Sequence, residues 1–326
     1  MRAAVLEDVQ KIVYREDYPK PVIGPNDVLV KVHYCGICGS DVPNFKYKLY
    51  QVPLILGHEI SGVVSEVGTN ITDVRVDDKV VAMNVLLDLY KETFEGMGIF
   101  DNGGFAEYVR VKRRNLFHTP ENISIKGATM IESFANITRA IRISRMSENE
   151  KVLIIGGGNI GLTFLTTVLS EKNPEYIIVV EPHQFLREKA IEFGANEAII
   201  PNKIKIKKLL KTFGAPTYIF DSVGSEETIL MAIDLIGRGG TILVEGMQRI
   251  KISIRILSII TKEITLKGCL GHDKEDILAA IDLFAKNKID PHKLISELVN
   301  LEDLQKTFEK LIEPGERRFI KLLVKV

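Results

Sequence analysis

A glycine-rich turn between an apolar strand and a helix constrains the fold of this chain more than any other feature. The turn is Gly156-Gly157-Gly158-Asn159-Ile160-Gly161, and it follows the apolar run 152–155. In the pattern G-x-G-x-x-G, the first glycine permits a tight turn, the second lets backbone approach a pyrophosphate, and the third lets the helix pack closely on the strand. We therefore expect a dinucleotide at the start of this helix. The expected binding residues are Gly156, Gly158, Asn159, Ile160 and Gly161, and neither Gly158 nor Gly161 should tolerate a side chain.

The segments around this turn repeat a strand and helix alternation. Short apolar runs typical of buried strands occupy 151–155, 176–180, 198–200, 218–221 and 241–244. Longer amphipathic segments lie between them, at 158–170, 184–193 and 226–236. Strand and helix in regular alternation predict a doubly wound parallel sheet of the Rossmann type.

Acidic Glu181 stands at the end of the strand predicted at 176–180. At this place a carboxylate accepts hydrogen bonds from the adenosine ribose and repels a 2′-phosphate, which favours NAD over NADP. His183 and Arg187 follow closely and keep a 2′-phosphate contact open as an alternative. Gly246 ends a later strand of the same sheet, at the carboxyl edge where such sheets bind ligands, and is expected near the nicotinamide.

The sequence before residue 120 has a different character. Short β-type runs, broken by Gly and Pro, occupy 27–34, 60–67, 79–85 and 105–111. This pattern predicts a mainly-β, barrel-like domain. After residue 273 the chain carries two amphipathic helices, near 274–287 and 301–312, and a strand at 319–326.

Composition excludes several classes of protein. The 326 residues contain 43 Lys and Arg against 43 Asp and Glu, so no net field recruits nucleic acid or an anionic membrane. No stretch approaches the roughly 18 apolar residues of a membrane span, and acid follows the N-terminus before a signal peptide could form. Three cysteines are too few for a disulfide framework. We therefore expect a cytoplasmic protein whose partner is a small molecule.

Two of the cysteines, Cys35 and Cys38, form a C-x-x-C pair. The sequence has no second pair for a structural zinc site, and the surroundings lack the context of a redox motif. His58 and Glu59 follow farther along the chain. A thiolate, an imidazole and a carboxylate form the mixed ligand set of a catalytic zinc, which keeps one position open for water or substrate.

The motifs together resemble one family. They are C-G-I-C-G-S-D at 35–41, G-H-E-I-S-G-V-V-S-E-V-G at 57–68, G-G-F-A-E-Y at 103–108, and the glycine-rich turn. In this order they resemble the zinc-dependent medium-chain alcohol and polyol dehydrogenases, closest in style to sorbitol, threonine and galactitol-phosphate dehydrogenases. The resemblance implies a GroES-like catalytic domain at 1–133, an inserted Rossmann domain at 134–272, and a segment at 273–326 that completes the catalytic domain. It also implies a homodimer or homotetramer, built in part through the Rossmann domain.

The resemblance further implies roles for single residues. It assigns the zinc thiolate to Cys38 and the imidazole to His58, which leaves Cys35 as a buried bystander. Glu132 takes the place of the family's third ligand, bound directly or through the metal's water. Glu59 is an alternative ligand or a nearby acid. Ser40 matches the hydroxyl that passes the alcohol proton towards solvent.

Two departures from the family pattern matter. The interval 84–102 contains no cysteine, so we expect one catalytic zinc per chain and no structural zinc. Pro43 replaces the histidine that ends the proton relay in many relatives, and this resembles the galactitol-phosphate branch. The expected reaction is hydride transfer from a secondary alcohol, polyol or polyol phosphate to NAD, giving the ketone. The alternatives are a sugar or L-threonine dehydrogenase and a metal-free quinone or enone reductase.

Overall fold

The computed structural model describes residues 1–84, 96–248 and 251–326, and it divides the chain into two compact units. The first unit comprises Met1–Glu132, His272–Gly315 and Lys321–Val326, and the second comprises Ser133–Gly271 and Glu316–Ile320. The interval 85–95, which covers most of the cysteine-free stretch noted above, lies outside the described residues.

The second unit is built on a six-stranded parallel sheet with the strand order β11-β10-β9-β12-β13-β14. The strands are β9 (Lys151–Ile155), β10 (Tyr176–Val180), β11 (Glu197–Ile199), β12 (Tyr218–Asp221), β13 (Thr241–Val244) and β14 (Thr265–Gly268). The order reverses at β9, which lies between β10 and β12. The glycine-rich turn follows β9 and therefore opens at the switch point, where such sheets bind ligands.

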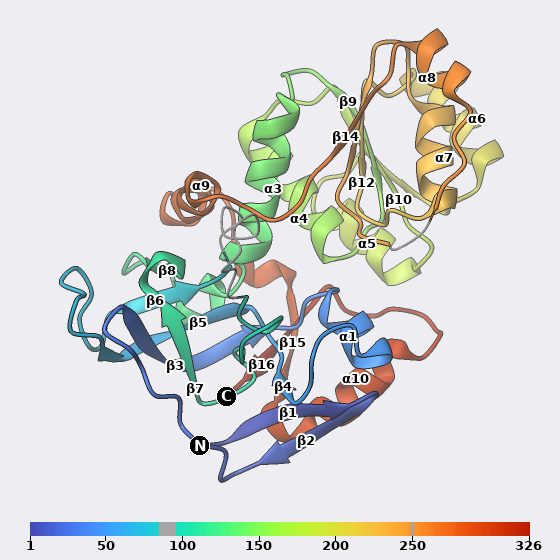
Figure 1. The fold of residues 1–326 in the computed structure, drawn as a ribbon. Coiled ribbons are helices and arrows are strands. Elements are labelled where there is room, and N and C mark those ends of the chain that lie inside the picture. The colour runs from blue at the N-terminus through green and yellow to red at the C-terminus, as the bar shows by residue number, and fades with distance from the viewer. Residues whose placement is uncertain (85–95, 249–250) are drawn as a thin grey trace. The chain divides into compact units, whose positions relative to one another are not determined.

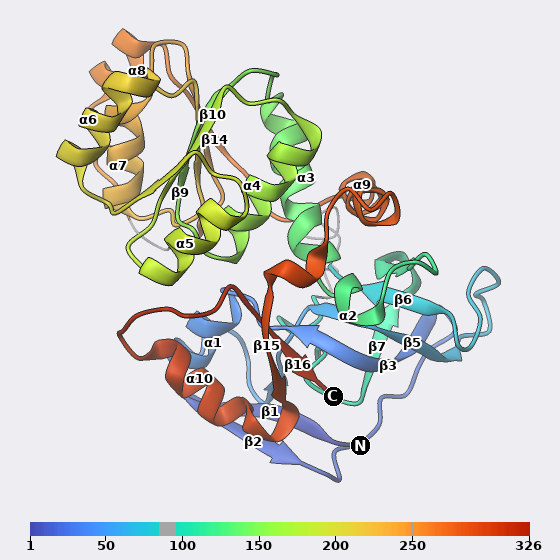
Figure 2. The ribbon, with the colours of Figure 1, turned by 180° about the vertical axis from the view of Figure 1, so that it is seen from behind.

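Helices cover both faces of this sheet (Figures 1 and 2). They are α3 (Ile131–Ser144), α4 (Asn159–Glu171), α5 (Gln184–Glu192), α6 (Lys203–Phe213), α7 (Glu226–Leu235) and α8 (Ile256–Lys262). On one face, Phe164 of α4 stacks on Phe220 of β12 with ring centroids 4.1 Å apart. On the other, α6 and α7 bury Ile206 and Ala232 completely against the strands. The predicted doubly wound sheet is confirmed.

The first unit is mainly β. A seven-stranded sheet has the order β15-β16-β3-β5-β6-β8, with β7 paired to β3, and a smaller sheet has the order β2-β1-β4. Its strands are β1 (Ala3–Asp8), β2 (Lys11–Arg15), β3 (Asp27–Gly36), β4 (Leu54–Ile55), β5 (Glu59–Val67), β6 (Lys79–Ala82), β7 (Tyr108–Lys112), β8 (Leu116–His118), β15 (Ile295–Asn300) and β16 (Lys321–Lys325). Strand β3 pairs with β5, β7 and β16, so this one strand organises the sheet.

Short helices complete the first unit. They are α1 (Asp41–Tyr47), α2 (Ile125–Ala128), α9 (Lys274–Ala285) and α10 (Leu304–Ile312), with 3-10 turns η2 (Arg113–Asn115), η3 (Pro291–Leu294) and η4 (Leu301–Asp303). Phe308 of α10 packs against Phe45 of α1, with ring centroids 5.2 Å apart. None of the helices in the described ranges combines the length and apolarity needed to cross a bilayer.

The C-terminal segment contributes to both units. The sequence predicts that all of 273–326 lies in the catalytic domain, whereas Glu316–Ile320 lies in the second unit. The cause is a pair of hydrogen bonds: the Arg317 backbone N–H donates to His183 Nδ1 (3.1 Å), and Glu316 Oε1 accepts from the Phe185 N–H (3.4 Å). Strand β15, which the sequence did not predict, pairs in parallel with β16.

The third glycine of the turn has no room for a side chain. A Cβ on Gly161 would lie 1.8 Å from the Gly156 carbonyl oxygen, whereas a Cβ on Gly158 would meet nothing closer than Arg317 at 3.7 Å. Gly158 therefore has space for a methyl group in this structure, contrary to the expectation for that position.

We predict that Gly161→Ala lowers the free energy of unfolding by about 1–3 kcal/mol, because the added methyl group forces strand and helix apart. The matched variant Gly158→Ala should lose less than about 1 kcal/mol, which is the weaker preference for Gly over Ala at a helix N-cap. Urea unfolding of both variants measures the difference. Equal stability of the two would contradict the packing argument.

Candidate metal centre and cofactor turn

The register of two antiparallel strands brings the candidate metal ligands together. Gly36, the last residue of β3, pairs with Glu59, the first residue of β5. Cys38 follows the end of β3, and His58 immediately precedes β5, so both lie at the same end of the paired strands. Strand pairing therefore brings Cys38 and His58 together although they are distant in the sequence.

Glycines hold the segment that carries His58. Gly57 has φ +92°, a conformation that L side chains rarely adopt. The Gly104 N–H donates to the Gly57 carbonyl (2.8 Å), and a Cβ on Gly103 would lie 2.1 Å from that same oxygen. The G-G-F-A-E-Y motif thus supplies the close backbone contact that fixes the position of His58.

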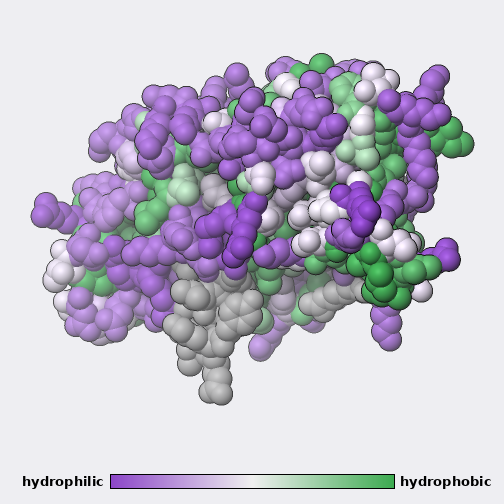
Figure 3. All heavy atoms as spheres, turned by 90° about the horizontal axis from the view of Figure 1, so that it is seen from above, coloured by the Kyte–Doolittle hydropathy of each residue, from purple (hydrophilic) through white to green (hydrophobic). Residues whose placement is uncertain are grey.

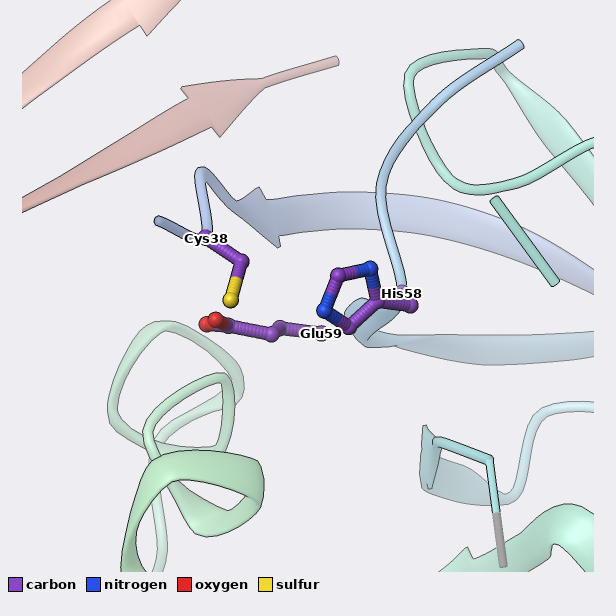
Figure 4. Close-up of side chains that lie close together, drawn as sticks. All are labelled: Cys38, His58 and Glu59. Atoms are coloured by element: carbon purple, nitrogen blue, oxygen red, sulfur yellow. The ribbon is translucent and has the colours of Figure 1, made fainter. Parts of the chain in front are cut away.

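Cys38, His58 and Glu59 form one compact group (Figure 4). One ligand atom from each of the three lies within 4.8 Å of the others. Cys38 is half-buried, while His58 and Glu59 are buried. A thiolate, an imidazole and a carboxylate so close together suit a borderline-soft cation such as zinc.

Asp41 orients this group from behind. One carboxylate oxygen accepts from the Cys38 backbone N–H (2.9 Å), and the other lies 3.6 Å from His58 Nδ1. The opposite ring nitrogen, Nε2, lies 3.5 Å from Ser40 Oγ. Because Nδ1 faces Asp41, Nε2 is the nitrogen left to bind a metal.

The surroundings of His58 favour a positive charge. Burial lowers the pKa of His58, but the charges of Cys38 and Asp41 outweigh burial and raise it well above its ordinary value. A buried position that stabilises a proton through anionic neighbours also stabilises a bound cation. The donor set and its field therefore fit a divalent metal.

Lys321 is a buried cation of this centre that the sequence did not reveal. Its Nζ lies 2.5 Å from both Glu59 oxygens, and both side chains are almost completely buried, at 2% and 1% exposed. Burial lowers the pKa of Lys321, but Glu59 and Cys38 raise it more, so the residue stays charged. A Cβ on Gly36 would lie 2.1 Å from Glu59, so glycine makes room for this ion pair.

Glu132 is buried in the first turn of α3 but is not part of the compact group of ligand atoms. Its Oε1 lies 3.9 Å from Nδ1 of His272, another buried residue that the sequence did not single out. The charge of Glu132 nevertheless acts on His58 and Lys321, so its carboxylate lies within electrostatic reach of the group.

Cys35 lies inside the core of the first unit. Its side chain is completely buried, and burial raises the pKa of the thiol well above its ordinary value. A neutral, inaccessible thiol is a poor metal ligand.

The glycine-rich turn of the second unit has the expected geometry. Gly156 has φ +94°, and a Cβ there would lie 2.4 Å from Ser222 Oγ. Gly158 is the N-cap of α4, and Asn159, whose Nδ2 donates to Ser133 Oγ (2.9 Å), begins the helix. The N-terminus of this helix offers backbone N–H groups to an anion.

Glu181 fastens the turn to the following strand. Its Oε2 accepts from the Gly157 N–H (2.7 Å) and its Oε1 from the His183 N–H (2.9 Å). Each oxygen keeps a second lone pair for a ribose hydroxyl. The Arg187 guanidinium, held open above as an alternative phosphate contact, donates instead to the carbonyls of Glu181 (2.9 Å) and Pro182 (2.5 Å).

Gly246 lies where β13 ends and packs against the loop after β12. A Cβ on Gly246 would lie 2.1 Å from the Val223 backbone, and a Cβ on Gly224 would lie 2.0 Å from the Gly246 carbonyl. These two glycines keep the carboxyl edge of the sheet free of side chains at this point.

We predict that Lys321→Met lowers the free energy of unfolding by about 3–5 kcal/mol, because it leaves Glu59 buried without its partner. The double variant Glu59→Gln, Lys321→Met removes both charges and should recover most of that loss. Urea unfolding of the wild type, both single variants and the double variant gives the coupling energy. Additive losses would show that the two buried groups do not stabilise each other.

Two family models match the chain. "Alcohol dehydrogenase GroES-like domain" matches residues 24–121, and "Zinc-binding dehydrogenase" matches residues 169–286. The first match lies in the mainly-β unit, and confirms its expected GroES-like class. The second covers 169–271 of the unit built on the parallel sheet and continues to residue 286 in the first unit.

Curated relatives match along nearly the whole chain. D-xylulose reductase A of Aspergillus oryzae is 28% identical over 335 residues, covering 94% of this chain and 92% of the relative. D-xylulose reductase of Saccharomyces cerevisiae is 26% identical over 333 residues, covering 94% of this chain and 93% of the relative.

Solved structures share the fold over the full length. An Escherichia coli alcohol dehydrogenase in complex with NADH has a TM-score of 0.91 at 26% identity, and 2R,3R-butanediol dehydrogenase of Bacillus subtilis has 0.89 at 25%. A zinc-binding dehydrogenase of Sinorhizobium meliloti bound to NADP also has 0.89 at 25%. Each comparison covers 100% of this chain and 99% of the other. With both units and the motifs in agreement, the chain belongs to the zinc-type medium-chain alcohol and polyol dehydrogenase family.

Proposed function

We propose that this protein is a dehydrogenase that transfers a hydride from the carbinol carbon of a polyol or related secondary alcohol to NAD, giving the ketone, with one catalytic zinc per chain. The observation that carries the proposal is the compact group of Cys38, His58 and Glu59 in the same chain as an intact dinucleotide turn. The named activities of the xylulose reductases and of butanediol dehydrogenase support the substrate class.

We assign zinc binding to Cys38, His58 and Glu132. Glu59 lies in the compact group with the first two, but its carboxylate already forms a buried ion pair with Lys321. Glu59 therefore acts as the alternative carboxylate, and Glu132 as the third ligand or the partner of the metal's water. Bound zinc lowers the pKa of an alcohol oxygen and polarises a carbonyl.

Residues of the protein position the metal ligands and take up the alcohol proton. Asp41 accepts a hydrogen bond from the Cys38 backbone N–H, and its other oxygen lies 3.6 Å from His58 Nδ1, so its charge favours a cation beside both ligands. Ser40, half-buried and 3.5 Å from His58 Nε2, is placed to take the alcohol proton at its Oγ. Pro43 follows in the short helix α1, so we assign the next acceptor to water or to the cofactor ribose.

NAD is the proposed cofactor, and it supplies the hydride acceptor. The carboxylate of Glu181 beside the turn supports NAD, since it would repel a 2′-phosphate. We assign Gly156, Gly158, Asn159, Ile160 and Gly161 to the phosphates, and Gly246 to the nicotinamide end.

We further propose a cytoplasmic homo-oligomer, a dimer or a tetramer, built in part through the second unit. Strand β14 is the end strand of the parallel sheet, and all four of its residues are exposed. Helix α8 just before it exposes Ile256 (66%) and Ile260 (63%). Figure 3 shows hydrophobic atoms in green on the right-hand side, where Figure 1 places α8. An exposed edge strand beside apolar side chains favours pairing with a second copy.

The first test is zinc content together with NAD reduction. Protein purified without added metal should contain about one zinc per chain and reduce NAD with a polyol or secondary alcohol from a panel that includes polyol phosphates. Cys38→Ser should lose both zinc and activity. Metal-free protein that reduces a quinone or enone instead would replace this proposal with the metal-free reductase alternative.

We predict that Glu132→Gln lowers zinc affinity by at least about ten-fold. Glu59→Gln should lower it less, because the Glu59 carboxylate is already paired with Lys321. Titration of each zinc-loaded variant with a competing chelator, monitored through the release of zinc, measures the zinc affinity of both variants. A larger loss in Glu59→Gln would assign the third ligand to Glu59.

We predict that Leu266→Lys on β14 converts the oligomer to smaller species, because a charge at a paired edge is unfavourable. Leu298→Lys on β15 is the matched control, since both leucines are 42% exposed on strands at the ends of their sheets. Light scattering after size-exclusion chromatography reports the mass. Dissociation in the control instead would move the interface to the first unit.

A further inference from the structure

We propose that Arg317 is a cofactor-binding residue whose guanidinium binds the pyrophosphate of the dinucleotide. This inference rests on the proposed function. It adds a residue from the C-terminal part of the chain to a site that is otherwise formed between β9 and α5.

The backbone around Arg317 is fixed to the second unit. The Arg317 N–H donates to His183 Nδ1 (3.1 Å), and Glu316 Oε2 lies 3.5 Å from the same nitrogen. Glu316 Oε1 accepts from the Phe185 N–H in the first turn of α5 (3.4 Å). The segment Glu316–Ile320 is thereby held beside the start of α5, which follows the strand carrying Glu181.

The side chain of Arg317 points at the glycine-rich turn. Its guanidinium stacks over the Phe319 ring, 4.5 Å from the centroid, which limits its freedom. Its Nη1 is the heavy atom nearest to the Cβ position of Gly158, at 3.7 Å. Gly158 is the N-cap of α4 and the glycine through which backbone approaches the pyrophosphate. The cation therefore stands beside the place where phosphate charge would lie.

The neighbouring basic side chains have other partners. Nη1 of Arg187 donates to two backbone carbonyls, and His183 Nδ1 accepts from the Arg317 N–H and lies 3.5 Å from Glu316. Arg317 interacts electrostatically with Glu181, whose two oxygens also accept backbone N–H bonds. A planar guanidinium with five donors can serve this carboxylate and still present N–H groups to phosphate oxygens.

Two observations favour the pyrophosphate over a 2′-phosphate as the group bound. Arg317 Nη1 lies 3.7 Å from the Cβ position of Gly158, at the start of α4, where the helix dipole also favours an anion. Glu181 lies at the ribose end and would repel a 2′-phosphate there. Both groups are phosphates on a dinucleotide, so the test must distinguish them.

The test measures binding of NADH, NADPH, ADP-ribose and adenosine by calorimetry to the zinc-loaded full chain. The variants are Arg317→Gln, Arg317→Lys and, as a matched control, Arg318→Gln, which removes the same charge from the next, exposed residue. We expect Arg317→Gln to lower the affinity for NADH and for ADP-ribose about ten-fold. Its affinity for adenosine should be unchanged, because adenosine has no phosphate. Arg317→Lys should recover part of the loss, and Arg318→Gln should bind all four as the wild type does.

Three results would overturn the assignment. Unchanged binding of ADP-ribose to Arg317→Gln would remove Arg317 from the cofactor site. Loss of NADPH alone would place the guanidinium at a 2′-phosphate, and an equal loss for adenosine would indicate a structural role. If the wild type itself binds none of the dinucleotides, the proposed function fails. If the wild type binds NADH and Arg317→Gln binds it equally well, only this inference fails.

Discussion

The pairing of β3 with β5, with Gly36 opposite Glu59, is the constraint on which the metal centre depends. It sets the end of one strand against the start of the next and so places Cys38 beside His58. The buried ion pair of Lys321 and Glu59 lies directly against this register, because β16 pairs with the same end of β3. Burial of two unscreened charges is tolerated only when each has its partner, so the pair also fixes the position of β16. A shift of one residue between β3 and β5 would separate the ligands and move Glu59 away from Lys321.

Catalysis by such a chain needs two different environments, and the two units supply one each. The first unit provides buried anionic donors that stabilise a cation. The second provides backbone N–H groups and glycines that accept a phosphate-rich ligand at the switch point of a parallel sheet. The C-terminal segment serves both units in turn. Residues Glu316–Ile320 belong to the second unit, and the next residue, Lys321, belongs to the first. Arg317 and Lys321 are thus supplied by one short stretch of chain.

Much of this architecture could be predicted from local patterns. The glycine-rich turn, the strands around it and the acid Glu181 follow one another in sequence, so spacing alone indicates the dinucleotide site. The compact group of Cys38, His58 and Glu59 followed from residue types and motifs. Lys321, His272 and the place of Arg317 could not be predicted, because each depends on contacts between distant segments. Strand β15 was also missed. Its residues are mostly exposed and show no clear alternation, so only its pairing with β16 reveals it. The expectation for Gly158 failed because the motif describes the space that a cofactor needs, and the protein atoms alone leave that position open.

Cys38 and His58 should hold one zinc in a mixed ligand set. X-ray absorption at the zinc edge of the purified protein resolves that set, because sulfur ligands lie farther from zinc than nitrogen or oxygen ligands. We expect one sulfur at about 2.3 Å and three nitrogen or oxygen ligands at about 2.0–2.2 Å, and no sulfur shell in Cys38→Ser after zinc is added back. A shell of two or more sulfurs, or a sulfur shell that persists in Cys38→Ser, would contradict this coordination.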